Sequence, residues 1–295
     1  MTSILGVAGR TGVQDHLTLA FPLKAAADAK ALAEKLPPLM PDLAKGADAV
    51  GTVHYSRFVV LSEKTLIFLA DFDGKLDKFL GDLAKNAGPV FDAVLEHVDG
   101  PPPSPVANNI AAFATWVMRH KLSPIAVYTA YPTGTVRDIK SRAAAAGITS
   151  KAEQLPFLVI LPLKSGVAEI ALKGVFKVAG SKLVDAADTV GTLHLAQFVL
   201  LEEHKFGFFT VYDGPFDKYI QDFAEKLGPI FDLLFKFVKD PPPTPSAKNA
   251  DALTKWIAEH NLPPIGMYNA YPGLRVQDVN ALLAEADESS SAKSA

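Results

Sequence analysis

Short apolar stretches alternate with segments of helical spacing along the first 75 residues of the chain. Residues 16–24 form an apolar run that ends near a proline, which predicts a strand. Residues 51–61 and 65–72 are two β-branched and aromatic runs only three residues apart, which predicts a β-hairpin. Between these strands, residues 25–45 are rich in Ala, Leu and Lys and predict a helix that is interrupted at its prolines.

The next 70 residues predict a second helical layer and a fourth strand. Apolar spacing over residues 76–98 predicts a helix that Gly88-Pro89 breaks or kinks. The remaining elements are a proline-stiffened loop, a short helix, a strand and a further helix, over residues 99–105, 109–121, 124–131 and 136–145. Without the interruptions the order is β-α-β-β-α-β.

The same pattern returns 140 residues later. Residues n and n+140 align without a gap over most of the sequence, as in Asp73-Gly74 over Asp213-Gly214, Pro101 to Pro103 over Pro241 to Pro243, and Ala130-Tyr131-Pro132 over Ala270-Tyr271-Pro272. A period this long predicts a duplicated domain rather than a solenoid. We place the two repeats at residues 16–150 and 151–287. An N-terminal segment over 1–15 precedes them, and a Ser-rich tail over 288–295 is expected to be disordered.

The repeated unit resembles the ferredoxin-like fold, whose split β-α-β-β-α-β order it shares. One four-stranded sheet with helices on a single face leaves its other face apolar and bare, and two copies can bury those faces against each other. The chain therefore resembles the dimeric α/β-barrel superfamily with both halves fused. We predict an α+β protein of two tandem repeats, packed sheet to sheet as a pseudo-twofold barrel, either monomeric or as a homo-oligomer.

Composition narrows the class of protein. Of the 295 residues 49% are hydrophobic, but no apolar run approaches the roughly 18 residues that a membrane helix needs. The net charge is −3 with Lys and Arg spread along the chain, which does not favour a nucleic-acid partner. The absence of Cys excludes disulfides and thiolate chemistry. We expect a cytoplasmic protein without a transmembrane segment or a dedicated metal site.

His54 and His194 are the sharpest polar features, because each lies mid-strand in an apolar segment. An imidazole between two sheets could bind haem or a metal, or act as acid or base. The alternative is a half-buried histidine that is hydrogen-bonded to the backbone or to a neighbouring strand.

Asp73-Gly74 and Asp213-Gly214 end the third strand of each repeat. An Asp at a strand-to-helix junction commonly caps the amides of the helix that follows. In the dye-decolorising peroxidases, which this topology resembles, an Asp-Gly at the end of a longer glycine-led motif supplies a distal acid near haem. That resemblance implies haem as a cofactor and Asp73 and Asp213 as catalytic candidates. Only the last two positions of the motif match, because the leading glycine is absent from both repeats.

Positions that differ between the repeats are candidates for binding one asymmetric ligand. These are Tyr55 (Leu195 in the second repeat), Arg57 (Gln197) and Asp71 (Val211). Arg57 and Asp71 lie on adjacent strands of the predicted hairpin, where they form either a cross-strand ion pair or polar groups facing a cavity. The fourth strands add four tyrosines that line a pocket or only pack, at positions Tyr128, Tyr131, Tyr268 and Tyr271.

These features lead to one main hypothesis and two rivals. The main hypothesis is a small-molecule-binding barrel that holds an apolar or aromatic ligand, with haem as one option. Its redox or acid–base chemistry would centre on His54 or His194, and Arg57 would orient an anionic group. The first rival is an interaction or structural protein with a filled barrel, whose proline-rich loops at 101–105 and 241–245 dock a partner. The second is a membrane-surface protein that uses the apolar helix at 231–238.

Overall fold

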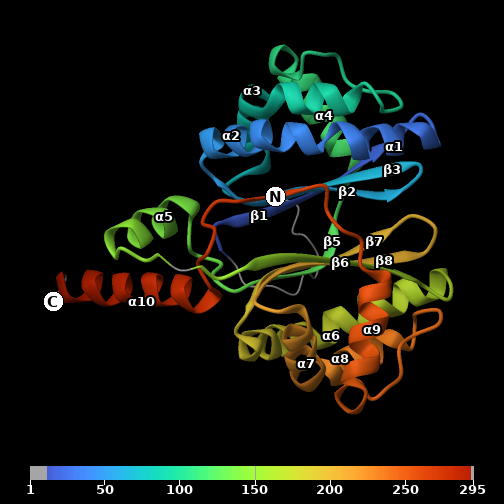
Figure 1. Ribbon diagram of the computed structural model, residues 1–295, viewed down its shortest axis with the longest axis vertical. Coiled ribbons are helices and arrows are strands. Elements are labelled where there is room, and N and C mark those ends of the chain that lie inside the picture. Colours follow the sequence, from blue (N-terminus) through green and yellow to red (C-terminus); the bar gives the residue numbers. More distant parts are fainter. Residues whose placement is uncertain (1–11, 150, 294–295) are drawn as a thin grey trace.

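The computed structural model describes residues 12–149 and 151–293, with side chains up to Glu285, and contains two antiparallel sheets between two helical layers (Figure 1). Most of the predicted N-terminal segment lies outside the described residues, and its last two positions open the first strand. The fold class is confirmed: the protein is α+β, with two ferredoxin-like halves packed sheet to sheet.

Sheet one is built mainly from the first half of the chain. Its strands are β1 (Gln14–Pro22), β2 (Val53–Ser62), β3 (Thr65–Asp73), β4 (Lys121–Leu122) and β9 (Met267–Asn269), in the order β4-β1-β3-β2-β9. The predicted hairpin is β2–β3, and β1 pairs antiparallel with β3 over its whole length. The helices that cover its outer face are α1 (Ala26–Lys35), α2 (Met40–Val50), α3 (Leu76–Leu95) and α4 (Ile110–His120), with 3₁₀ turns at Pro37–Leu39 and Val106–Asn108.

Sheet two has the same plan. Its strands are β5 (Pro124–Thr129), β6 (Gln154–Pro162), β7 (Leu193–Leu201) and β8 (Lys205–Asp213), in the order β5-β7-β8-β6. The covering helices are α6 (Gly166–Val190), α7 (Phe216–Lys226), α8 (Gly228–Phe235) and α9 (Ala250–His260), with a 3₁₀ turn at Ser246–Lys248. The apolar residues Phe231, Leu234, Phe235 and Val238 are buried in the core, which leaves little of that segment for a membrane surface.

The fourth strand of each half pairs with the sheet of the other half. In the first half the chain begins this strand as β4, beside β1 in sheet one, and continues as β5, which pairs with β7 in sheet two. In the second half, Asn261 bridges to β6 of its own sheet, and β9 then pairs with β2 of sheet one. The sequence predicts these strands but places them in their own sheets. Each half therefore completes the sheet of the other.

Two further details differ from the sequence-based expectation. Helix α3 runs through Gly88-Pro89 without a break, because residues on both sides of Pro89, such as Leu83 and Val94, are buried against the core and hold the helix straight. In the second half the break occurs as predicted, at Leu227 between α7 and α8.

Two helices, α5 (Val136–Ala145) and α10 (Val276–Lys293), follow the exchanged strands and lie side by side beyond one end of the sheets (Figure 1). A helix thus occupies most of the region where the sequence predicts a disordered tail. Within the described residues, no helix combines the length and apolarity needed to span a bilayer.

The exchanged strands predict how the first half behaves alone. A fragment of residues 1–150 keeps β5 but lacks its partner β7, and its β2 lacks β9. We expect the fragment to form a dimer in which each β5 pairs with the β2 edge of the other copy, because both edges otherwise expose unpaired backbone groups. Light scattering after size-exclusion chromatography would test this, and a stable folded monomer would contradict it.

Candidate functional site

The inner face of sheet one follows from strand alternation, because successive side chains point to opposite faces of a sheet. Tyr55 contacts residues of the second half, and Val59 packs against apolar residues of sheet two, so Arg57 between them also faces sheet two. Strand register then sets three rows across this face. The first row holds Asn269, Tyr55, Asp71 and His16, the second Met267, Arg57, Leu69 and Thr18, and the third Val59, Ile67 and Ala20.

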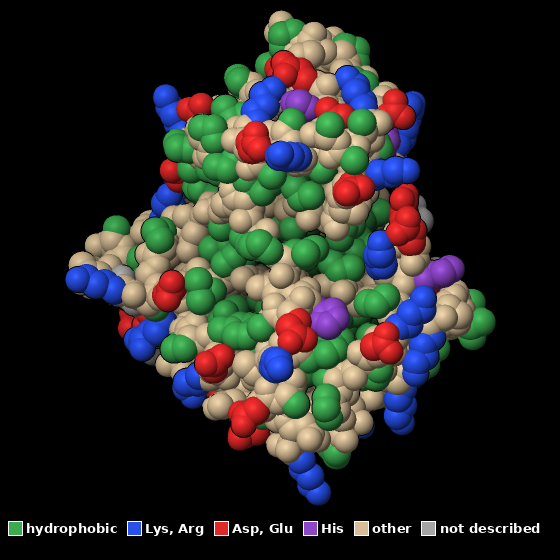
Figure 2. All heavy atoms as spheres, turned by 45° about the vertical axis from the view of Figure 1, so that its right-hand side comes forward, with side chains coloured by type: hydrophobic (Ala, Val, Ile, Leu, Met, Phe, Trp, Pro, Cys, Tyr) green, Lys and Arg blue, Asp and Glu red, His purple; other side chains and the backbone are tan. Residues whose placement is uncertain are grey.

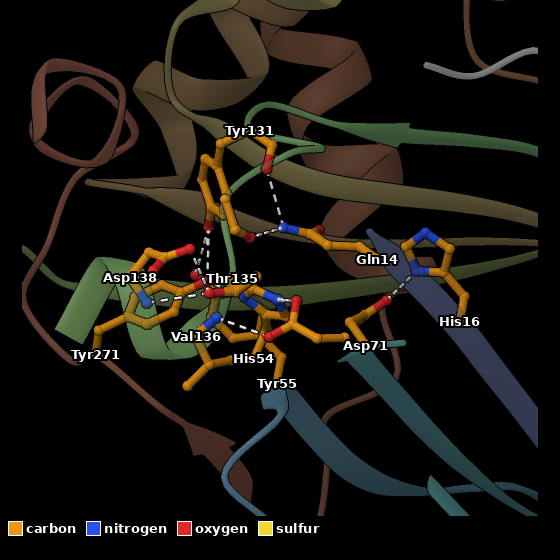
Figure 3. A network of polar contacts seen from close by, with 12 residues as sticks. Gln14, His16, His54, Tyr55, Asp71, Tyr131, Thr135, Val136, Asp138 and Tyr271 are labelled. Atoms are coloured by element: carbon orange, nitrogen blue, oxygen red, sulfur yellow. Dashed lines mark hydrogen bonds and ion pairs between the residues drawn. The ribbon is translucent and has the colours of Figure 1, made fainter. Parts of the chain in front are cut away.

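A buried chain of hydrogen bonds crosses the seam between the two halves (Figure 3). His54 Nδ1 lies 2.7 Å from the hydroxyl of Tyr271, and His194 Nδ1 lies 2.7 Å from the hydroxyl of Tyr131. The two hydroxyl oxygens are 3.1 Å apart. Each contact has a counterpart 140 residues away, so the contact between Tyr131 and Tyr271 lies on the pseudo-twofold axis.

The outer ends of this chain are carboxylates. Asp73 Oδ1 lies 2.8 Å from Nε2 of His54, and Asp73 Oδ2 accepts the backbone N–H of Val136 at 2.8 Å. Asp213 makes the equivalent two contacts in the second half. The sequence analysis expected each Asp to cap the helix that directly follows it. The structure corrects this expectation: Asp73 caps α5 and Asp213 caps α10, because the exchanged strands bring those helix N-termini to the ends of β3 and β8.

The carboxylates fix the protons of both imidazoles. A carboxylate only accepts hydrogen bonds, so Nε2 of His54 and of His194 carries a proton and donates it to its Asp. Each Nδ1 then accepts the proton of a tyrosine hydroxyl. Both ring nitrogens of both histidines are in use, so neither side chain offers a free nitrogen to a haem iron, and the residues present do not fit the expected haem site.

Tyr55 joins this chain from one side only. Its hydroxyl lies 3.1 Å from that of Tyr131 and donates to Oε1 of Gln154 at 3.2 Å. Asn269 donates to the same oxygen of Gln154. In the second half Leu195 stands in place of Tyr55, so the symmetry of the seam ends at this residue.

Burial sets the titration of the seam tyrosines. Removal from water is the largest influence on Tyr55, Tyr131 and Tyr271, and it raises the pKa of each phenol above its ordinary value. Their protons therefore stay on oxygen at neutral pH. The other two predicted tyrosines lie elsewhere: Tyr128 donates to Asp188 and Tyr268 to Asp48, each on the covering helix of its sheet.

A second polar cluster surrounds Asp71 in the first row. Its Oδ1 lies 2.5 Å from Nδ1 of His16 and 2.7 Å from Nε2 of Gln197, which reaches across from sheet two. Gln197 also accepts the hydroxyl proton of Thr18 at 2.9 Å. Figure 3 shows His16 and Asp71 pointing toward each other from adjacent strands. Asp71 is only 2% exposed, and it joins both sheets through hydrogen bonds.

Arg57 lies in the next row and is 1% exposed. Neither its Nε nor its Nη1 has a hydrogen-bond partner, and no described residue forms an ion pair with it within 4 Å. Burial lowers the pKa of Arg57 to about 10, against the opposing influence of the Asp71 carboxylate. Of the two arrangements predicted for Arg57 and Asp71, the close ion pair is absent. Arg57 is a buried cation with donors unused.

The equivalent positions in sheet two are almost entirely apolar. His16, Thr18 and Asp71 correspond to Pro156, Leu158 and Val211 at the offset of 140. Of the sheet-two counterparts of the polar pair at Tyr55 and Arg57, only Gln197 is polar. The second polar cluster thus belongs to one half, unlike the histidine–tyrosine chain.

A pocket of about 610 Å³ opens at the hairpin end of the space between the sheets. Its apolar lining comes from both sheets, at Leu61, Ile67, Leu122 and Leu201. Charged residues of both signs also line it, among them Lys64, Arg119, Lys205, Glu63 and Glu202. Figure 2 shows apolar side chains gathered between the helical layers on the hairpin side of the molecule, with charged side chains around them.

Sequence reasoning missed three members of the site. His16 was read only as the first residue of a strand, Gln197 only as the counterpart of Arg57, and Gln154 not at all. Alternation on β1 does place His16 and Thr18 on one face of that strand, but which strand lies opposite them depends on the register with β3. That register is a long-range property.

Comparisons with known proteins give only a general likeness. No family model and no curated protein matches the chain. Among solved structures, a proposed monooxygenase from Fusobacterium nucleatum is 12% identical, with a TM-score of 0.41, and the match covers 90% of this chain and 98% of that one. A proposed monooxygenase from Lactobacillus acidophilus (11% identical, TM-score 0.32, 88% and 98% covered) and an anthrone oxidase-like protein (8%, 0.29, 88% and 94%) are also similar. These values are too low to support a conclusion about activity.

The seam tyrosines predict a loss of stability in alkali. Their folded-state pKa values lie above the unfolded value near 10, so their contribution is complete below pH 10 and is lost as pH rises through the folded pKa. In the double variant Tyr131→Phe/Tyr271→Phe, we expect the free energy of unfolding to fall less steeply above pH 10, by up to about 2.7 kcal/mol per pH unit. At pH 8 the same variant should be less stable by about 1–3 kcal/mol for each histidine left without its donor.

Urea unfolding between pH 8 and 11.5 would measure both effects. Each single variant should show about half of the change in slope. An alkaline slope equal to that of the unsubstituted protein would contradict the assignment of buried, un-ionised phenols at the seam.

Proposed function

We propose that the protein binds a small molecule with an apolar or aromatic body and an anionic group, in the space between its two sheets. The observation that carries this proposal is Arg57, a buried guanidinium with two unpartnered nitrogens that faces the opposite sheet. A buried charge without a partner is unfavourable, and an anionic ligand group that accepts from Arg57 would relieve that penalty.

The apolar part of the ligand has a matching surface. Ile67 in the third row lines the hairpin-end pocket, and the row that holds Arg57 is the next one along the strands. Adjacent rows on one face are about 7 Å apart, a distance that a small aromatic anion spans. The pocket volume of about 610 Å³ lies within the range of small-molecule sites. A ligand that enters at the hairpins would thus place its anionic end toward Arg57.

The alternative is a closed barrel that binds no ligand and serves as an interaction protein. It is favoured by the apolar cluster in the middle of the barrel, where Val59, Leu69, Val199 and Phe209 pack against one another across the sheets. In that case the proline-rich loops would be the docking surfaces. The two functions predict different behaviour toward a small aromatic anion.

Two fluorescent dyes that differ in charge would test the proposal. The first, 1-anilinonaphthalene-8-sulfonate, carries a sulfonate, and the second, N-phenyl-1-naphthylamine, has nearly the same rings without one. We expect the Arg57→Gln variant to bind the sulfonate dye about tenfold more weakly and the neutral dye equally well, because it loses one charge-assisted contact. Leu201→Trp, which narrows the pocket, should weaken the binding of both dyes.

Lys205→Gln is the matched control, since it removes a positive charge at the pocket mouth and leaves Arg57 in place. Circular dichroism would show that each variant remains folded before dye is added. Equal binding of the sulfonate dye to Arg57→Gln and to the unsubstituted protein would refute the role of Arg57. Failure of both dyes to bind would favour the closed barrel.

A further inference from the structure

We propose that His16 and Asp71 form a base dyad that removes a proton from the molecule bound at Arg57, from a carbon next to a carbonyl group. This inference rests on the proposed binding function and assigns that site a reaction. It is carried by the contacts of His16, by the position of Arg57 on the same sheet face, and by the difference between the two halves of the chain.

The contact with Asp71 leaves one nitrogen of His16 free. Nδ1 lies 2.5 Å from the carboxylate, so it carries the proton of a neutral imidazole. Nε2 then bears a lone pair, and no described residue forms a hydrogen bond with it. The His16 side chain is 11% exposed, whereas those of His54 and His194 are almost fully buried and use both nitrogens. Of these three strand histidines, His16 is the one that can accept a proton from another molecule.

Asp71 is held in place for this role. Its Oδ1 accepts from Gln197 as well as from His16, and burial keeps competing water away from the pair. A carboxylate on Nδ1 fixes the tautomer and orientation of an imidazole and stabilises the imidazolium that forms when Nε2 takes a proton. Gln197 comes from sheet two, so the dyad depends on the packing of both halves.

Arg57 and His16 stand on either side of one strand. Arg57 is on β2 and His16 on β1, with β3 between them, so their backbones are about 10 Å apart across the sheet. Their long side chains flank the face of β3 at Leu69 and Asp71. A small molecule over β3 can therefore contact a base on one side and a cation on the other.

The reaction follows from that arrangement. Nε2 of His16 takes the proton as the C–H bond breaks, and the electron pair of that bond moves to the carbonyl oxygen. The resulting enolate is negatively charged, and the unpartnered N–H groups of Arg57 stabilise it. Return of the proton to the same or another atom of the enolate completes an exchange or an isomerisation. No oxidant or reductant is consumed.

The second half cannot perform the same step. Pro156, Val211 and Gln197 stand at the positions of His16, Asp71 and Arg57, so the base, its carboxylate and the cation are all replaced there. One asymmetric site per chain is the consequence. The ligand class is an enolisable carbonyl compound that carries an anionic group and an apolar body, such as an aryl-substituted 2-oxo acid.

Phenylpyruvate is a suitable probe, because it combines an aromatic ring, a carboxylate and an acidic benzylic C–H. Proton NMR in D₂O would follow deuterium exchange at the benzylic carbon. We expect the protein to accelerate exchange above the buffer rate and His16→Gln to lose about 100-fold or more of that acceleration. The affinity of His16→Gln for phenylpyruvate, measured by displacement of the sulfonate dye, should stay within about twofold.

Two further variants separate a catalytic from a structural role. Asp71→Asn should lower the rate and also move the limb of the pH–rate profile that reports the base, which a merely structural role would not do. His204→Gln is the matched control, because His204 also pairs through Nδ1 with a carboxylate, Glu169, but lies exposed on the hairpin of sheet two. Its exchange rate should equal that of the unsubstituted protein.

The outcomes distinguish the two proposals. Phenylpyruvate that binds without accelerated exchange, or exchange that persists in His16→Gln, overturns the base dyad and leaves the binding function intact. Phenylpyruvate that fails to displace the dye shows that the site does not take an aryl 2-oxo acid, and the base dyad for this ligand class is then overturned. Failure of the dye itself to bind removes the binding function and the dyad together.

Discussion

The need to cover the inner faces of two one-sided sheets governs this structure. Helices pack on the outer face of each sheet, so the inner face can leave water only by contact with the other sheet. The apolar cluster around Val59 and Phe209 satisfies this need in the middle of the barrel. The polar groups that remain inside must then find partners across the seam, and nearly all of them do.

Those partners divide into two sets with different symmetry. The chain from Asp73 through His54 and the paired tyrosines to His194 and Asp213 is the same from either end, and all of its members contact one another. Its carboxylates also cap α5 and α10. Such a complete network stabilises the seam and fixes where the helices begin. The set around His16, Asp71 and Arg57 occurs once and is incomplete, which is the usual condition of a site that meets a ligand.

Local sequence patterns predicted the elements and the fold class well. Alternation and helical spacing depend on neighbouring residues, and the offset of 140 made each prediction twice. The same patterns could not show that β5 and β9 leave their own sheets, because a strand reads alike whichever edge it joins. Pro89 was expected to break a helix, but buried residues on both sides of it outweigh the lost hydrogen bond.

For the site, the sequence pointed to the right region but not to the right roles. His54 and Asp73 were noticed because each is a polar interruption of an apolar pattern, yet their partners lie far away along the chain, at Tyr271 and Val136. Comparison of the repeats did single out Tyr55, Arg57 and Asp71. It could not find His16, whose meaning depends on the register of β1 against β3.

The exchange of the fourth strands also has a consequence for how the protein is made. Sheet one receives its last edge strand, β9, only when the end of the chain has left the ribosome, so β2 waits with unpaired backbone groups while the whole second half is synthesised. Contacts between such distant parts of a chain form slowly, because a large loop must close first. The first half can therefore begin to fold early, but its sheet is finished only at the end of translation.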